Sequence, residues 1–141
     1  MHKKFKGDCI YLSELDVHFP ELTLGQTLTF AAATRQTNLE SKSGAYNAAK
    51  NISSRFNLDA AFDTKIGNAI IRGISGGEKR RTSIAEGFIS GARLQLCDNS
   101  TRGLDSSTAL RLIRLMRNST TNMRSTALMS IYQASDAIYE A

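Results

Sequence analysis

Apolar and polar positions repeat with two different periods along this chain. Three short apolar runs, at residues 8–12, 93–97 and 125–131, predict strands. Apolar positions at helical spacing predict helices over residues 24–35, about 46–56, 76–90 and 106–117, and another from Asp136 onward. Residues 36–44 predict a surface loop, and residues 58–73 a loop with a helical turn. Because strands and helices alternate in the second half, we expect a parallel α/β sheet there and a mostly helical first half.

The helical stripes predict which side chains face a core. They comprise Leu24, Leu28 and Ala31, then Ile84, Phe88 and Ile89, then Ala109, Leu112, Ile113 and Met116. The chain of 141 residues is long enough for one domain with a core, and its 41% hydrophobic and 22% charged content is typical of soluble globular proteins. No apolar run approaches the roughly 18 residues that predict a membrane-spanning helix.

The distribution of charge and cysteine argues against a nucleic-acid-binding face, a disulfide and a metal site. The net charge of +5 includes clusters at positions 3, 4 and 6 and at positions 79–81. Aromatic residues do not interleave with these bases, so we interpret them as solvated surface rather than a nucleic-acid face. Cys9 and Cys97 both lie in apolar runs, which predicts two buried, reduced thiols rather than a disulfide or a metal site. The two histidines, His2 and His18, lack ligand spacing.

Two stretches carry candidate chemistry. Ser75-Gly76-Gly77-Glu78 opens a helix, and the backbone N–H groups and dipole of a helix N-terminus favour an anion such as phosphate. About twenty residues later, a buried strand delivers Asp98 to its C-terminal end, where a nucleotide's magnesium is commonly held. Each stretch alone also fits a plain structural role. Together they suggest nucleoside-triphosphate chemistry, although the chain contains no Gly-x-x-x-x-Gly-Lys-[Ser/Thr] loop.

In their order and spacing, these motifs resemble those of ATP-binding cassette (ABC) transporters. Residues 74–85 are similar to the signature loop, 94–98 to the Walker B strand and 103–105 to the D-loop. Glu14 stands at the Q-loop position and Tyr132 at the switch-histidine position. Residues 16–20, 74–86 and 98–105 are especially similar to the pleiotropic drug resistance subfamily of fungal transporters. The resemblance covers essentially the whole chain.

The resemblance implies an α/β fold and a domain organisation. It predicts a partial P-loop NTPase (ABC ATPase) core with parallel strands, built from residues 1–23 and 91–141, plus a helical subdomain over about 24–90 that carries the signature loop. Because a Walker A loop would lie upstream of the Q-loop, the chain is predicted to be an internal piece of a longer protein. Neither tight ATP binding nor ATPase activity is expected from this chain alone.

Three positions depart together from the general cassette pattern. Glu14 replaces the glutamine that senses magnesium and the attacking water, Asn99 replaces the glutamate that acts as general base, and Tyr132 replaces the histidine that contacts the γ-phosphate. An amide cannot accept a proton as a carboxylate can, so Asn99 is predicted to disable base catalysis at its own site. The set resembles the first, N-terminal nucleotide-binding domain of drug-resistance transporters, in which one of two sites is degenerate.

The resemblance also implies that two such domains stack head to tail. The nucleotide-binding residues would then be Ser75, Gly76, Gly77, Glu78, Asp98 and Asp105. Residues 75–78 would serve the partner domain's ATP, whereas Asp98, holding Mg²⁺ through water, would face the degenerate site together with Asn99. The implied cofactors are ATP and Mg²⁺ in the complete assembly. The implied partners are a second nucleotide-binding domain and the transmembrane domains of the same transporter, with no nucleic acid.

We therefore expect a fragment of the energy-coupling domain of an ATP-driven exporter of drugs, xenobiotics or lipids, at the cytoplasmic face of the plasma membrane. Residues 14–20 would lie near its transmembrane helices. Two alternatives stay open: a soluble, non-transport cassette ATPase, such as those that act in translation or DNA repair, and an inactive product of a truncated gene. Membrane-spanning segments in the parent gene would distinguish the exporter from the soluble cassette ATPase. The transported substrate does not follow from these residues.

Overall fold

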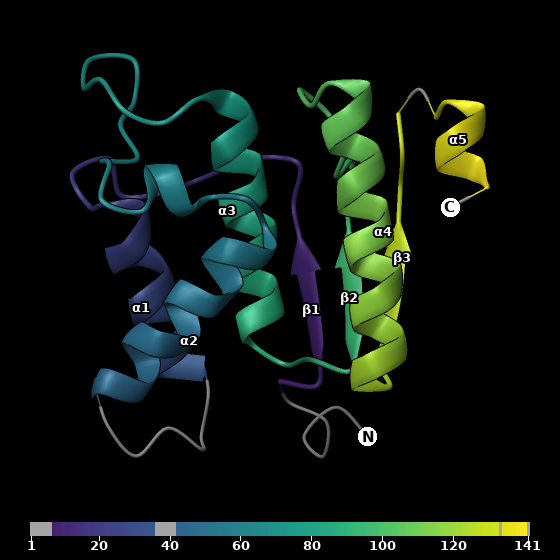
Figure 1. The fold of residues 1–141 in the computed structure, drawn as a ribbon, viewed down its shortest axis with the longest axis horizontal. Helices are drawn as coiled ribbons and strands as arrows, with labels where there is room; N and C mark the ends of the chain where they lie inside the picture. Colours follow the sequence, from purple (N-terminus) through teal and green to yellow (C-terminus); the bar gives the residue numbers. More distant parts are fainter. Residues whose placement is uncertain (1–6, 36–41, 133, 141) are drawn as a thin grey trace. The chain divides into compact units, whose positions relative to one another are not determined.

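The computed structural model describes residues 7–35, 42–132 and 134–140. The lysines at positions 3, 4 and 6, His2, Gln133 and most of the predicted loop at 36–44 lie outside these ranges. The chain divides into two compact units (Figure 1). Residues 1–15 and 91–141 form one, here called the sheet unit, and residues 16–90 form the other, here called the helical unit.

The sheet unit contains the predicted parallel sheet. Its strands are β1 (Cys9–Leu12), β2 (Leu94–Cys97) and β3 (Thr126–Met129), in the spatial order β1-β2-β3. Both pairings are parallel and in register, so Cys9, Leu94 and Thr126 stand side by side, as do the residues that follow them. Helix α4 (Ser106–Met123) connects β2 to β3, and the short α5 (Asp136–Tyr139) follows β3. The predicted α/β class is confirmed.

Helix α4 begins and ends for identifiable reasons. Its N-cap is Asp105, whose carboxylate accepts a hydrogen bond of 3.0 Å from the backbone N–H of Thr108. The helix ends at Met123 rather than at the predicted Arg117, and its C-cap, Arg124, has a left-handed φ of 50°. The helix continues through polar residues beyond Arg117, and the hydroxyl groups of Thr120 and Thr121 both donate to the Arg117 carbonyl oxygen at 2.9 Å.

The inward face of α4 largely matches the predicted stripe. Ala109, Leu112 and Met116 are buried, whereas Ile113 is only half-buried. Ile113 and Met116 line a small cavity against Ala127 and Met129 of β3. Because Ala127 and Met129 are in register with Gln95 and Cys97, helix α4 covers the sheet face that carries these residues.

On the opposite face of the sheet, Cys9 differs from its prediction. Cys9 and Cys97 form no disulfide, but Cys9 is exposed whereas Cys97 is buried. Cys9 alternates with Ile10, so it shares its face with Tyr11, which is 64% exposed. The expectation that both thiols are buried is therefore wrong. Successive residues of a strand point to opposite faces, and an apolar run does not say which face is covered.

The helical unit consists of α1 (Leu24–Arg35), α2 (Lys42–Arg55), the 3-10 helix η1 (Asp59–Ala61) and α3 (Gly76–Ile89). Helix α1 has the predicted bounds. At its start, Thr23 and Gln26 form reciprocal side chain to backbone hydrogen bonds of 3.1 and 3.0 Å. Helix α2 begins earlier than predicted, and η1 supplies the predicted helical turn.

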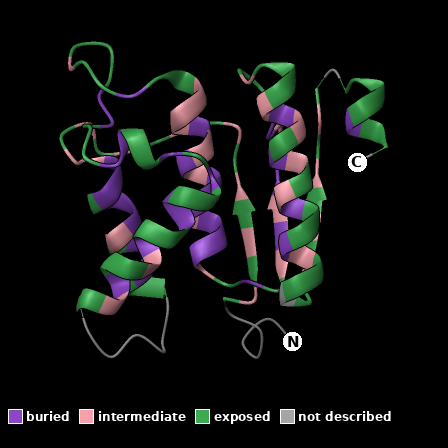
Figure 2. Ribbon diagram, in the orientation of Figure 1, coloured by how far each residue is buried: buried purple, intermediate pink, exposed green. Residues whose placement is uncertain are grey.

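A compact apolar core holds these helices together. Buried positions line the facing sides of α1, α2 and α3 (Figure 2). Its members include the predicted residues Leu24, Leu28, Ala31, Ile84, Phe88 and Ile89. The rings of Phe56 and Phe88 meet edge to face at 5.4 Å between centroids. At Gly25 a Cβ atom would lie 2.4 Å from the ring of Phe62, so glycine lets that ring approach α1 closely.

Candidate functional site

The start of α3 has the geometry of an anion-binding turn. Ser75 is the N-cap, and its hydroxyl oxygen accepts a hydrogen bond of 3.3 Å from the backbone N–H of Glu78. The Glu78 carboxylate in turn accepts one of 2.7 Å from the backbone N–H of Ser75. A Cβ atom added at Gly76 would meet nothing within 4 Å, so the approach to the first turn is open. First-turn N–H groups have no intrahelical acceptor and suit an anion.

The loop before this turn is held by backbone contacts. The backbone N–H of Ile74 donates to the carbonyl oxygen of Lys65 at 3.1 Å. The Lys79 ammonium donates to the carbonyl oxygen of Gly67 at 2.8 Å. A Cβ atom on Gly73 would lie 2.2 Å from the Ile66 carbonyl oxygen, so the chain can cross itself there only with glycine. These contacts fix the entry to the turn.

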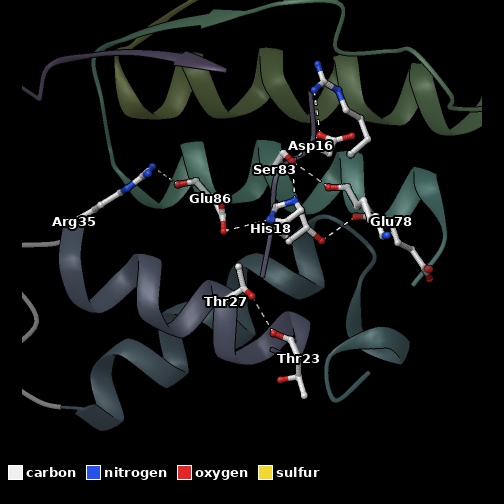
Figure 3. Close-up of polar contacts among 11 residues, drawn as sticks. Asp16, His18, Thr23, Thr27, Arg35, Glu78, Ser83 and Glu86 are labelled. Carbon is white, nitrogen blue, oxygen red and sulfur yellow. Dashed lines mark hydrogen bonds and ion pairs between the residues drawn. The ribbon is translucent and has the colours of Figure 1, made fainter. Parts of the chain in front are cut away.

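A partly buried polar cluster involves the second and third turns of α3, directly after the first turn (Figure 3). Asp16 accepts a hydrogen bond of 2.6 Å from the Ser83 hydroxyl and lies 3.2 Å from an Arg80 guanidinium nitrogen. His18 Nε2 lies 2.9 Å from the same hydroxyl oxygen. On the other side of the ring, His18 Nδ1 lies 3.8 Å from a carboxylate oxygen of Glu86. Arg80 is only 2% exposed, so the prediction that the basic cluster at positions 79–81 is solvated surface is wrong at this residue, where Asp16 compensates the buried charge. No site role was predicted for Ser83 or Glu86.

The protonation of this cluster is unusual. Burial raises the pKa of the Glu86 carboxyl to about 7, against a weaker opposing effect of the positive charge on Arg35. Burial likewise lowers the pKa of the His18 imidazole below its usual value. In both groups burial disfavours the charged form, which accounts for the direction of each pKa shift.

In the sheet unit, Asp98 directly follows β2 and is held by hydroxyl groups from both neighbouring strands. One carboxylate oxygen accepts a hydrogen bond of 2.9 Å from the Tyr11 phenol, and the other accepts one of 2.8 Å from the Ser130 hydroxyl. The bond to Asp98 raises the pKa of Tyr11. These three side chains meet at the carboxyl end of a parallel sheet, where ligands of open α/β folds bind.

Asp98 offers one carboxylate to a magnesium ion. Within the described ranges, no group of three or more His, Cys, Asp or Glu side chains is placed to hold a metal. Mg²⁺ bound with a nucleotide usually takes only one or two carboxylates and keeps several waters. A carboxylate oxygen can also accept more than one hydrogen bond. Asp98 therefore fits an indirect ligand that contacts Mg²⁺ through water.

Asn99 adopts a left-handed backbone conformation, with a φ of 47°. Its backbone N–H donates to the Ser130 hydroxyl oxygen at 2.7 Å. Its buried side-chain oxygen has no hydrogen-bond partner in the part of the chain that the structure describes. Asn99 and Tyr132 line the same cavity of about 530 Å³, together with residues of α4 and α5.

Glu14 and Asp105, the remaining predicted site residues of this unit, both make contacts with other side chains or with the backbone of the chain. Glu14 forms an ion pair with Arg102. Asp105 caps α4, and hydrogen bonds from Ser107 and Thr108 hold the pKa of its carboxyl well below the usual range. The structure thus places Glu14, Asp98, Asn99, Asp105 and Tyr132 in the sheet unit, and Ser75 to Glu78 in the helical unit. Their roles in nucleotide binding stay predictions.

Comparison with known proteins settles the family. The family model described as "ABC transporter" matches residues 1–102. The chain belongs to the ABC transporter family. This ABC chain is 48% identical to "ABC-type transporter eriD" of Hericium erinaceus and 47% identical to "ABC multidrug transporter A-2" of Aspergillus fumigatus. It is also 45% identical to "Protein SNQ2" of Saccharomyces cerevisiae.

Each of these matches covers 99% of the ABC chain and 10% of the relative, so the chain spans about a tenth of the length of these relatives. The predicted resemblance to pleiotropic drug resistance transporters of fungi is confirmed, as is the partial ABC ATPase fold. In the described part of the chain, no helix combines the length and the apolar character needed to cross a membrane.

Proposed function

We propose that this ABC chain is part of a nucleotide-binding domain in an ATP-driven exporter of drugs, xenobiotics or lipids. It supplies residues 75–78 to the ATP site of a second nucleotide-binding domain, while its own site does not hydrolyse ATP. The observation that carries the proposal is the combination of an open, capped signature turn with an amide, Asn99, directly after Asp98. One chain then contributes to a working site and contains a silent one.

The geometry of the signature turn supports the first half of the proposal. The Ser75 hydroxyl oxygen accepts the hydrogen bond from Glu78, so its own proton is available to a phosphate oxygen. The N–H groups of Gly76 and Gly77 belong to the first turn, where a negative charge is stabilised by the helix dipole. The partner domain's γ-phosphate would be held by this hydroxyl and these amides.

The chemistry of the sheet unit supports the second half. Asp98 would hold Mg²⁺ through water, and the ion would neutralise phosphate charge when bound. Asn99 can orient a water molecule through its amide but cannot remove a proton from it. Tyr132 offers a phenol hydroxyl where a histidine would contact the γ-phosphate. Nucleotide at this site would be retained rather than hydrolysed.

The proposal extends to partners and location. Val17 and Phe19 are among the exposed large apolar side chains of the described residues, and they belong to the segment expected near transmembrane helices. We place the domain at the cytoplasmic face of the plasma membrane, in contact with the transmembrane domains of the same transporter. ATP and Mg²⁺ act in the complete assembly. Membrane-spanning segments in the parent gene are expected, and their absence would refute the exporter proposal.

Two substitutions in the full-length protein test the division of roles. Ser75→Arg places a bulky cation in the open turn and should block ATP turnover. Asn99→Ala removes a side chain that cannot act as a base and should leave most turnover intact. ATP hydrolysis by purified, membrane-reconstituted protein is the measurement. Equal losses from both substitutions would contradict the proposal. For the isolated chain we expect no ATPase activity, and turnover that Asp98→Ala abolishes would also contradict it.

A further inference from the structure

We propose that Asp16 and His18 are positioning residues for the signature turn. They bind the second and third turns of α3 and thereby fix the direction in which its first turn presents Ser75. The inference rests on the proposed function, because it concerns the same turn. It concerns residues outside the predicted nucleotide-binding set, and every contact that it uses lies within the helical unit.

The first contact is a buried ion pair. Arg80 lies five positions after Ser75, and its side chain is only 3% exposed, against 21% for Asp16. One oxygen of Asp16 lies 3.2 Å from the Arg80 guanidinium and also accepts the 2.6 Å hydrogen bond from Ser83. A buried guanidinium needs a compensating charge, so Asp16 cannot leave this position without a large cost.

The second contact extends the network to His18. The Ser83 hydroxyl has one proton, which it donates to Asp16 over the shorter distance, so its oxygen accepts a hydrogen bond from His18 Nε2–H at 2.9 Å. This assignment leaves His18 Nδ1 facing Glu86 at 3.8 Å. The direction of these bonds argues against a nucleophilic serine. The proton of Ser83 points to a carboxylate, and the imidazole donates to the serine instead of accepting its proton.

The spacing along α3 explains why two residues suffice. Arg80, Ser83 and Glu86 lie three residues apart and form one stripe on the helix, about 9 Å long at 1.5 Å per residue. Asp16 and His18 lie two positions apart in a segment that is neither helix nor strand. Asp16 contacts Arg80 and Ser83, and His18 contacts Ser83 and Glu86, so the two side chains together contact the whole stripe. An α-helix is stiff over this length, so its first turn follows the orientation set by the second and third.

Asp16→Asn in the full-length protein is the direct test. The variant keeps the size and shape of the side chain but removes the charge that Arg80 requires. We expect ATP turnover to fall about tenfold to a hundredfold, since a small misplacement of a positioning element has an effect of this size. The Kd for ATP, measured without turnover, should stay within about twofold of the wild type. The matched control is Asp59→Asn, at an exposed acidic residue of the same unit, which should change neither quantity.

A second measurement does not depend on turnover. Hydrogen exchange at the backbone amides of Glu78 and Lys79, which donate to the hydroxyl and carbonyl oxygens of Ser75, should accelerate in Asp16→Asn and in Ser83→Ala, because both variants weaken the contacts between α3 and the segment that carries Asp16. Asp16→Glu, which restores the charge, should recover part of the turnover. Unchanged exchange in both variants would overturn the inference. It would also be overturned if Asp16→Asn weakened ATP binding and turnover equally and Asp16→Glu failed to rescue, because that pattern indicates general misfolding.

Ser75→Arg, assayed in parallel, separates the two proposals. If Ser75→Arg leaves ATP turnover intact, the proposed function fails, and the exchange data alone judge the role of Asp16. If Ser75→Arg blocks turnover while Asp16→Asn changes neither turnover nor exchange, the proposed function stands and the positioning role is refuted.

Discussion

Glu86→Gln should change how the stability of this ABC chain depends on pH. The Glu86 side chain is 24% exposed and faces His18, and burial raises the pKa of its carboxyl from 4.5 to about 7. Arg35 opposes this shift, and one of its guanidinium nitrogens lies 3.4 Å from the Glu86 main-chain oxygen. Glutamine keeps the shape of the side chain and cannot ionise, so it resembles the protonated form of Glu86.

The direction of the pH dependence follows from the number of protons that the folded and unfolded chains bind. Between pH 4.5 and about 7 the folded chain keeps a proton on Glu86 that the unfolded chain has lost. The free energy of unfolding therefore falls as the pH rises through this window. A pKa difference of about 2.5 corresponds to about 3 kcal/mol. His18 has the opposite sign, because its lowered pKa makes stability fall as the pH drops through its unfolded value of 6.5, and this contribution remains in the variant.

Urea unfolding followed by circular dichroism measures the effect. Relative to the wild type, Glu86→Gln should gain about 3 kcal/mol between pH 4.5 and pH values above 7. The matched control is Glu21→Gln, since Glu21 is 65% exposed and pairs with an exposed Lys65, so it should show little pH-dependent difference. In NMR, the Glu86 carboxyl carbon should titrate near pH 7. Parallel pH profiles for wild type and Glu86→Gln would refute the reasoning.

Three further outcomes are expected. Thr23→Ala removes the hydroxyl oxygen that accepts a hydrogen bond from the Gln26 N–H at the start of α1. The free energy of unfolding should fall by about 1 kcal/mol, and an unchanged urea midpoint would contradict this. Leu28→Ala deletes a fully buried side chain and should cost about 2–5 kcal/mol in the same assay, whereas a loss below about 1 kcal/mol would indicate a poorly packed core. A thiol reagent should modify Cys9 in the folded chain and Cys97 only after unfolding, and equal rates would disprove the assigned faces of the sheet.

Local signals predicted the elements that have local causes. The bounds of α1 follow from the Thr23–Gln26 capping pair and an uninterrupted apolar stripe. The start of α2 was missed because Ser43 and Gly44 are typical of loops, yet both lie inside the helix. The exposure of Cys9 could not be predicted because it depends on which sheet face another element covers, and strand periodicity carries no information about that.

The candidate site also combines elements that local sequence predicts with contacts that it does not predict. The signature turn and the strand that precedes Asp98 have sequence patterns of their own, and both elements form as predicted. The cluster around Ser83 joins residues more than sixty positions apart, so no motif spacing could reveal it. In the segment 16–19, polar Asp16 and His18 alternate with apolar Val17 and Phe19, a pattern that predicts burial of the apolar pair. The structure shows the reverse, because Val17 and Phe19 are exposed and the polar pair contacts α3.

The order of the strands has a consequence for synthesis of the chain. Strand β1 pairs with β2, whose residues follow it by about eighty positions, and the helical unit occupies the sequence between them. At about 5–20 residues per second, a ribosome needs roughly 4–16 s to supply this partner, which is ample time for helices to form. The helical unit, continuous in sequence, can therefore fold as it emerges, while β1 has not yet paired with β2. A pause in translation between residues 16 and 90 would prolong this unpaired state of β1, the strand that carries the exposed thiol of Cys9.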